Sequence, residues 1–195
     1  MKIIYKSLII TLISFTILGC NQVKKEPRKE IKLEVFLNDF FEQNPNWNQN
    51  DIIKKEVNEK FNEEIKLQLD KGILDDFPLE LGAINEYKKG KFAAIFNSHY
   101  TKSDAISYDN IIYSTKFDVI GLISPEQVKI LQEDKAYLIK GKFEKFLKGE
   151  FKNYVNGMVY TPIVEISKDI MSNKNEASLG IILIEISEIT ETKKL

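Results

Sequence analysis

The sequence predicts an α+β protein, in which an N-terminal helical segment is followed by a small antiparallel β-barrel or sheet with one short helix between strands. Apolar residues recur every three or four positions between residues 31 and 72, which is typical of helices. They recur every second position in short segments between residues 79 and 189, which is typical of strands. A helix-start signal lies between two of those segments.

The composition is that of a globular protein. The chain has 195 residues, 43% hydrophobic and 29% charged, which excludes a disordered tail, a collagen and a multi-span membrane protein. Its single Cys excludes an internal disulfide framework and a multi-cysteine metal site, and its single His excludes paired-histidine zinc motifs. The formal charge of −1 argues against a dedicated nucleic-acid binder. We expect no metal site and no cofactor.

The first nineteen residues form a predicted export signal. Lys2 and Lys6 give a short positive region, and no charged residue follows from Ser7 to Gly19. This uncharged run is shorter than the roughly 20 residues that a membrane-spanning helix needs, and it fits the apolar region of a signal peptide. The run ends at the only cysteine, Cys20.

The end of this run resembles the lipobox of bacterial lipoproteins. Ile17-Leu18-Gly19-Cys20 places a branched apolar residue at −3, a small residue at −1 and Cys at +1. The resemblance implies cleavage after Gly19, a diacylglycerol thioether on Cys20 and further acylation of the new amino group, so that membrane lipid is the first partner. The alternatives are an uncleaved N-terminal anchor and a chance apolar stretch with a buried Cys.

A short polar tether is expected over residues 20–30, since the segment is charged and contains Pro27. Removal of residues 1–19 would leave 26 basic residues against 29 acidic ones, a formal charge of −3. Attraction to anionic lipid is therefore not the main anchor. The expected location is the bacterial cell envelope, on the periplasmic or outer face of a membrane.

The helical region is expected over residues 31–72. Its first helix, 31–43, carries an apolar face that we assign to the core rather than to a partner or a membrane: Phe36, Leu37, Phe40 and Phe41. A second helix is predicted over 51–70, with Asn50 or Asp51 as its cap and Gly72 as its end. An apolar residue recurs there at every fourth position: Ile53, Val57, Phe61, Ile65 and Leu69.

Strands are predicted where the period changes to two, at residues 92–97, 111–119, 137–144, 159–166 and 181–189. Between the second and third of these, Ser124 and Gln127 form a capping box with Pro125 at the first helical position. A short helix is expected to continue to about Glu133.

The order of these elements resembles the OB-fold, and the segment 134–143 is similar to the strand after the helix in the tRNA-anticodon-binding-like OB group. The resemblance covers residues 79–189. It implies that Gly141 lies where that strand coils and that residues 147–178 are an insertion. A different α+β sheet or barrel is the alternative.

Candidate catalytic chemistry is sparse. His99 would need an orienting acid and a nucleophile to act as a general base, and neighbouring Ser98 would point to the opposite side of a strand. The carboxylate clusters have no calcium-loop spacing, and polar turns or a helix face explain them: Glu63-Glu64, Asp75-Asp76 and Asp104/Asp109. No phosphate-binding or nucleophile-elbow motif occurs. We expect no catalytic residue.

A basic stretch over residues 135–152 interleaves lysines with aromatic residues, as single-strand-binding OB faces do. Its candidate ligand-binding residues are Tyr137, Lys140, Lys142 and Phe143. Export and the presence of only one arginine, Arg28, argue against nucleic acid as the ligand. A solvated strand face is the alternative.

The sequence thus favours a non-catalytic, membrane-anchored envelope lipoprotein that binds a protein or an envelope component. Two alternatives stay open. One is a lipid-anchored enzyme that uses carboxylates distant in sequence, and the other is an OB-type binder of an anionic ligand.

Overall fold

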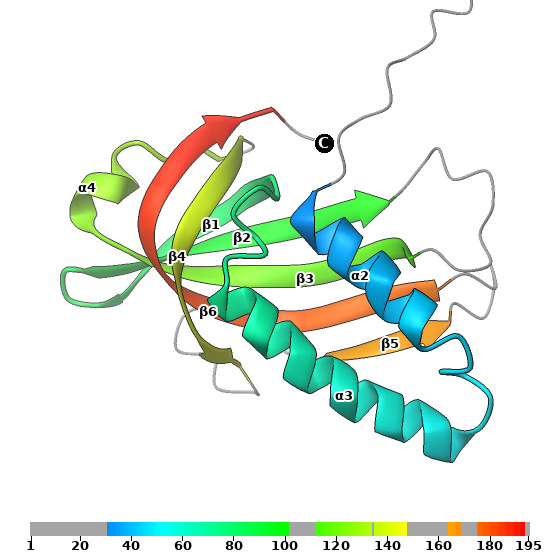
Figure 1. Cartoon of the computed structure of the whole chain (residues 1–195). Helices are drawn as coiled ribbons and strands as arrows, with labels where there is room; N and C mark the ends of the chain where they lie inside the picture. The colour runs from blue at the N-terminus through cyan, green and yellow to red at the C-terminus, as the bar shows by residue number, and fades with distance from the viewer. Residues whose placement is uncertain (1–30, 102–111, 134, 148–163, 169–174, 194–195) are drawn as a thin grey trace, which may run out of the picture.

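The protein is described by a computed structural model that covers residues 31–101, 112–133, 135–147, 164–168 and 175–193. Its helices and single six-stranded sheet confirm the predicted α+β class (Figure 1). The helices are α2 (Lys32–Gln43), α3 (Asp51–Asp70) and α4 (Pro125–Val128). The strands are β1 (Leu79–Lys88), β2 (Lys91–Thr101), β3 (Ile112–Ile123), β4 (Ala136–Phe146), β5 (Val164–Lys168) and β6 (Asn175–Thr192).

The boundaries of α2 and α3 follow from their end residues. At α2, the backbone N–H of Ile31 donates to the Glu34 carboxylate at 2.9 Å. At α3, the Asn50 side chain accepts from two backbone N–H groups of the first turn, both at 3.0 Å, as its predicted role as a cap requires. Gly72, with φ +73°, ends the helix in the left-handed conformation that suits glycine. No described helix combines the length and the apolar character needed to cross a membrane.

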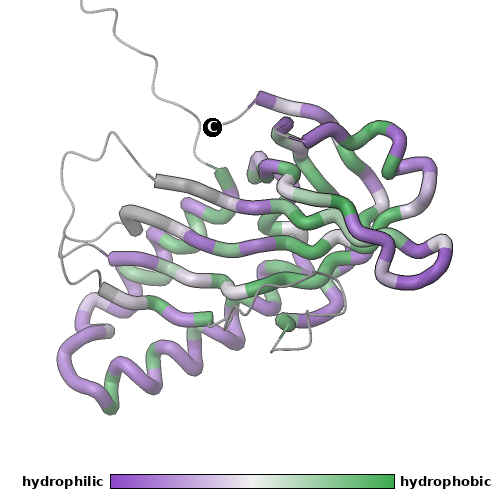
Figure 2. The backbone as a smooth tube through the Cα atoms, turned by 180° about the vertical axis from the view of Figure 1, so that it is seen from behind, coloured by the Kyte–Doolittle hydropathy of each residue, from purple (hydrophilic) through white to green (hydrophobic). Residues whose placement is uncertain are grey.

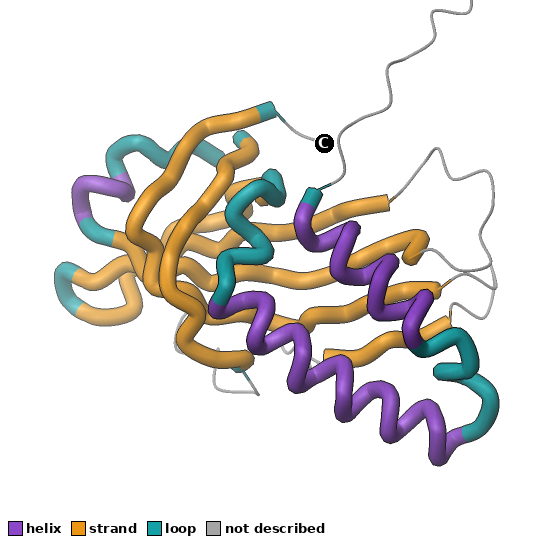
Figure 3. The backbone as a smooth tube through the Cα atoms, viewed as in Figure 1, coloured by secondary structure: helices purple, strands orange, loops and turns teal. Residues whose placement is uncertain are grey.

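Helices α2 and α3 lie side by side over one face of the strands (Figures 1 and 3). The predicted apolar face of α2 is in the core, since Leu37, Phe40 and Phe41 are only 2–3% exposed, whereas Phe36 is half-buried. Phe61 of α3 is completely buried and meets Phe40 edge-on, with ring centroids 5.2 Å apart. Hydrophobic and hydrophilic residues alternate along much of the strand trace, and α3 is mostly hydrophilic (Figure 2). Contact between these buried aromatic side chains therefore holds the two helices together.

The strand pairings form a closed circuit. The sheet order is β3-β2-β1-β4-β6-β5, and an additional pairing joins β3 to β6. All described pairings are antiparallel except β3–β6, which is parallel. The β1–β4 link is short and consists of Leu79 opposite Tyr137 and Glu80 opposite Ala136. Strand β6 therefore has the most strand partners of the described sheet, because β3, β4 and β5 all pair with it.

Several predicted boundaries are wrong. Strand β1 lacks a clean alternation, because residues on both of its faces are partly exposed, and the sequence did not mark it. The last strand begins at Asn175, not at residue 181, so the predicted insertion 147–178 is shorter and contains β5. The short helix ends at Val128, not near Glu133. Of the strand predicted at 159–166, residues 159–163 lie outside the described residues.

Gly141 lies at a shift in register between β4 and β6, as its predicted role requires. A Cβ atom at this position would collide with the backbone carbonyl oxygen of Glu185 on β6. The close approach of the two backbones therefore needs glycine here.

The outer edge of β5 is hydrogen-bonded to side chains of α3. The Asn58 Oδ1 atom accepts from the Ile166 backbone N–H at 2.7 Å, and the Asn58 amide donates to the Ile166 carbonyl at 3.4 Å. One helical turn later, the Asn62 amide donates to the Val164 carbonyl at 2.9 Å. Two asparagine side chains thus hydrogen-bond to backbone groups at the edge of β5, with which a further strand could otherwise pair.

Candidate functional site

A pocket of about 520 Å³ lies between α2 and the C-terminal end of α3. The two helices contribute its walls, and the turn that follows α3 contributes the rest: Lys32, Val35, Phe36, Asp39, Gln68, Lys71, Ile73 and Asp76. The α2 positions are spaced three or four residues apart and so share one helical face. Its volume falls in the range of small-molecule sites, about 300–1,000 Å³.

Part of the pocket wall is apolar. Val35 is 42% exposed. Phe36 is half-buried, and its ring stacks on that of Phe61 with ring centroids 6.3 Å apart. Leu67, which is 58% exposed, precedes the lining residue Gln68 on α3. Exposed apolar side chains next to a concavity are a common mark of a contact surface.

The rim of the pocket carries two lysines and two aspartates. The Lys32 ammonium donates to the Gly72 carbonyl at 3.3 Å and lies 3.8 Å from the Asp75 carboxylate. The Lys32 backbone N–H meets both carboxylate oxygens of Asp76 at 3.3 Å. These contacts fix the start of α2 to the turn after α3. The side chains of Asp39 and Lys71, in contrast, form no ion pair with a described residue.

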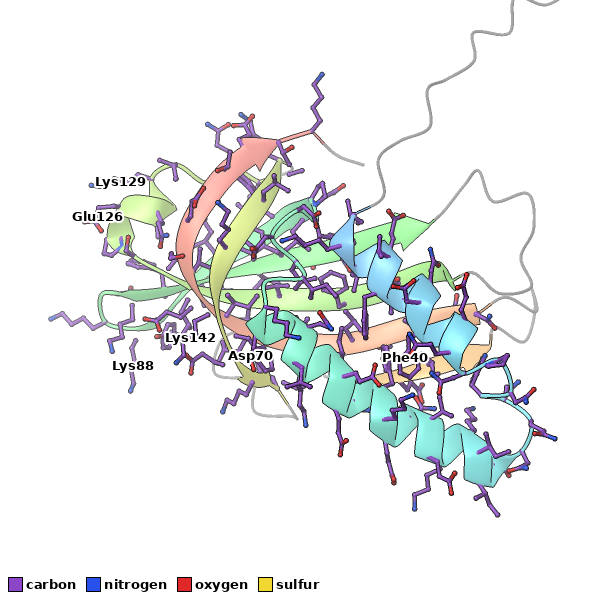
Figure 4. The ribbon with its side chains drawn as sticks, in the orientation of Figure 1. Phe40, Asp70, Lys88, Glu126, Lys129 and Lys142 are labelled. Atoms are coloured by element: carbon purple, nitrogen blue, oxygen red, sulfur yellow. The ribbon has the colours of Figure 1, made fainter. Side chains whose placement is uncertain are left out.

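A second candidate surface is the tip of the β1–β2 hairpin, a projecting end on which Lys88 is labelled in Figure 4. Lys88 pairs with Lys91 across a two-residue loop, in which Gly90 has φ +72° and donates its N–H to the Glu86 carboxylate. Lys88, Lys89 and Lys91 are exposed and form no ion pair with a described residue. This tip was not predicted from the sequence, although Gly90 is a turn signal.

The predicted ligand-binding face on β4 does not present its four residues together. Tyr137 is 1% exposed, and its hydroxyl accepts from the Gln132 backbone N–H at 2.8 Å, so its ring belongs to the core. Phe143 is half-buried and packs edge-on against Phe146, with ring centroids 5.3 Å apart. The aromatic part of the predicted stacking surface is therefore mainly core packing.

The two lysines of that face have carboxylate partners. Lys140 lies 2.8 Å from Glu188, and Lys142 lies 2.9 Å from Glu144. These hydrogen bonds raise the pKa of both ammonium groups. Lys135 is paired to Glu191 in the same way at 2.9 Å, which likewise raises its pKa. The face thus carries paired charges rather than a free positive field.

Of the residues considered for catalysis, Ser98 has a structural role in the described part of the chain. The buried Ser98 hydroxyl donates to the Phe117 carbonyl at 2.8 Å and accepts from the Phe117 N–H at 3.0 Å, so it bridges β2 and β3. The backbone of His99 pairs with Lys116 in the same two strands. Within the described ranges, no group of three His, Cys, Asp or Glu side chains is arranged to hold a metal ion. Asp104 and Asp109 lie outside these ranges.

The predicted lipidation residue Cys20 and cleavage residue Gly19 lie outside the described residues. Comparison of the chain with protein-family models, with curated proteins and with solved structures found no match.

Proposed function

We propose that this chain is a membrane-anchored, non-catalytic envelope lipoprotein that binds a protein or an envelope component. One sequence observation carries the proposal: the uncharged run ends in Ile17-Leu18-Gly19-Cys20, and this is the only cysteine of the chain. The first described helix, α2, starts at Lys32, only twelve positions later. Such a domain would stay close to its membrane and would act there by contact.

The finer proposal for the fold is an OB-like barrel. Three features support it: the closed circuit of β1, β2, β3, β6 and β4, the parallel β3–β6 pairing, and the position of α4 between β3 and β4. The OB-fold is in general a five-stranded, partly open barrel. The two-residue link between β1 and β4 is the most open seam of this circuit. Strand β5 would then be an addition within the connection from β4 to β6.

The polar groups of the described core support a binding role over a catalytic one. Every buried side-chain nitrogen or oxygen of the described residues has a hydrogen-bond partner. Glu34 holds the start of α2, and Ser98 bridges two strands. An enzyme that uses sequence-distant carboxylates is the alternative, and Asp39 and Asp76 at the pocket are the pair that favours it.

An OB-type binder of an anionic ligand is the second alternative. The hairpin tip favours it, since Lys88, Lys89 and Lys91 project without carboxylate partners among the described residues. Binding through such a tip would weaken steeply with salt. Replacement of the three lysines by glutamine should then abolish it, whereas Lys140→Gln should not.

The decisive experiment combines metabolic labelling with a fatty-acid probe and mass spectrometry of the chain from intact cells. Wild type should carry lipid and lose residues 1–19, and Cys20→Ser should remain an unlabelled precursor of about 22.6 kDa. Photo-crosslinkers at Val35 and at Lys88 in the lipidated chain would then show which surface meets a partner. Normal processing of Cys20→Ser would contradict the proposal.

A further inference from the structure

The pocket between α2 and α3 opens beside the point at which the tether joins the domain. Lys32 is both the first residue of α2 and a lining residue of the pocket. From Cys20 to Ile31 the chain advances eleven residues, which span at most about 40 Å when fully extended. If Cys20 is lipidated as proposed above, the pocket stays within that distance of the bilayer surface.

Of the charged side chains that line the pocket, Lys71 and Asp39 have neither an ion pair nor a hydrogen bond to a described residue. Lys32 and Asp76 are engaged with each other's segments. Lys71 and Asp39 form no ion pair with a described residue, and they come from opposite walls of the pocket. A ligand with one negative and one positive group would complement both, whereas an anion alone would leave Asp39 facing like charge.

The apolar part of the wall suits a ligand that also has a hydrocarbon part. Val35 is 42% exposed, and half-buried Phe36 packs its ring against Phe61 of α3. Their exposed carbon surface would be removed from water by acyl-chain or glycerol carbons at the edge of a bilayer. The mature formal charge of −3 gives no general attraction to anionic lipid.

From these observations we propose that the pocket binds the head group of a zwitterionic phospholipid in the anchoring membrane. The lipid phosphate lies at Lys71, its ammonium lies at Asp39, and the glycerol region contacts Val35 and Phe36. This inference rests on the proposed lipid anchor. It adds to that anchor a second contact, which sets the side of the domain that faces the bilayer.

The test places a fluorophore at the pocket of the lipidated, full mature chain. Cys20 would be blocked as a thioether, so Leu67→Cys, next to the lining residue Gln68, supplies the single reactive thiol. Ile52→Cys is the matched control, because Ile52 is 72% exposed on the same helix and about 22 Å from residue 67 at 1.5 Å per residue. Both labelled chains are incorporated into phosphatidylcholine–phosphatidylethanolamine vesicles that contain a lipid with a nitroxide on its head group.

The expected result is loss of fluorescence at residue 67 and retention at residue 52. Lys71→Glu should abolish the quenching at residue 67, and so should Asp39→Lys. Lys66→Glu makes the same charge change at an exposed position of α3 that does not line the pocket, and it should leave the quenching unchanged. Replacement of the zwitterionic lipids by phosphatidylglycerol should reduce the quenching.

Each other result overturns the inference. Equal quenching at residues 52 and 67, or none at 67, excludes a pocket that faces the head groups. Quenching that survives Lys71→Glu reports mere closeness to the membrane, and stronger quenching in phosphatidylglycerol excludes a zwitterionic ligand. A chain found to carry no lipid by mass spectrometry would overturn the proposed function together with this inference. A lipidated chain without quenching would overturn the inference alone.

Discussion

The contact between α3 and the edge of β5 gives the sharpest prediction for stability. In Asn58→Ala the Ile166 backbone N–H loses its partner at 2.7 Å, and Ile166 is completely buried. Loss of a hydrogen bond costs about 1 kcal/mol, and a buried donor left unpaired costs about 1–3 kcal/mol. Alanine recovers about 0.5 kcal/mol because it favours helix more than asparagine does. We expect a net loss of about 0.5–2.5 kcal/mol in the free energy of unfolding.

The assay is urea unfolding of the mature chain, followed by circular dichroism and by the fluorescence of Trp47, the one tryptophan. Asn58→Asp keeps the acceptor oxygen for Ile166 but places a second oxygen against the Lys54 and Ile166 carbonyls, to which the Asn58 amide donates, so it should also be destabilised. Glu59→Ala changes an exposed neighbour on the same helix and should stay within about 0.5 kcal/mol of wild type. If Asn58→Ala unfolds like wild type, the edge contact has no stabilising role.

Three further predictions test the core, the glycine at the strand crossing and a surface ion pair. Phe61→Ala, at a completely buried ring, should cost about 3–5 kcal/mol in urea unfolding, and a loss below about 1 kcal/mol would contradict its place in the core. Gly141→Ala should cost at least about 1–3 kcal/mol in thermal unfolding, because the new Cβ meets the Glu185 carbonyl, whereas Gly82→Ala should cost less because only a side chain must move. The raised pKa of Lys140 means that its carboxylate partner stabilises the folded chain below pH 10.5 and that this contribution is lost as the pH rises through the higher folded pKa. Unfolding curves should therefore show a steeper loss of stability above pH 10.5 for wild type than for Lys140→Gln, and parallel curves would refute the pairing.

Helix α3 could be predicted to the residue because its boundary signals are local. Asn50 caps its first turn through its own side chain, and Gly72 supplies the left-handed turn at its end. The capping box of Ser124 and Gln127 was equally local and is confirmed, with both hydrogen bonds formed at 2.8 and 3.2 Å. Helix α4 ends earlier than predicted, because the backbone N–H groups of Lys129 and Ile130 donate to carbonyls three positions before them, as in a turn, and not four positions before them.

The strands were harder because their burial depends on neighbours distant in the sequence. Residues 181–184 of β6 are buried on both faces, so the expected alternation is absent there. The first part of that strand was not predicted, because Ser178 and Gly180 interrupt its apolar pattern. Tyr137 illustrates the same problem, since an alternating pattern separates two faces but does not say which of them faces the core.

The pocket was beyond prediction from the sequence for a related reason. Its walls come from residues 32–39 and 68–76, and the contact that joins them, Lys32 to Asp76, spans 44 positions. The aspartates at 75 and 76 were recognised only as a polar turn. Their role in fixing the start of α2 emerges once the two helices are packed.

The dependence of the sheet on β6 has a consequence for the order in which the chain matures. The last strand pairs with β3, β4 and β5, and its parallel pairing brings Ile112 opposite Asn175. No earlier described strand can substitute for these contacts, and such distant pairings form slowly. A chain threaded across a membrane from its N-terminus would therefore remain unfolded until β6 had emerged. In a chain exported as proposed above, β1 to β5 would all cross the membrane before β6, the strand that closes the sheet.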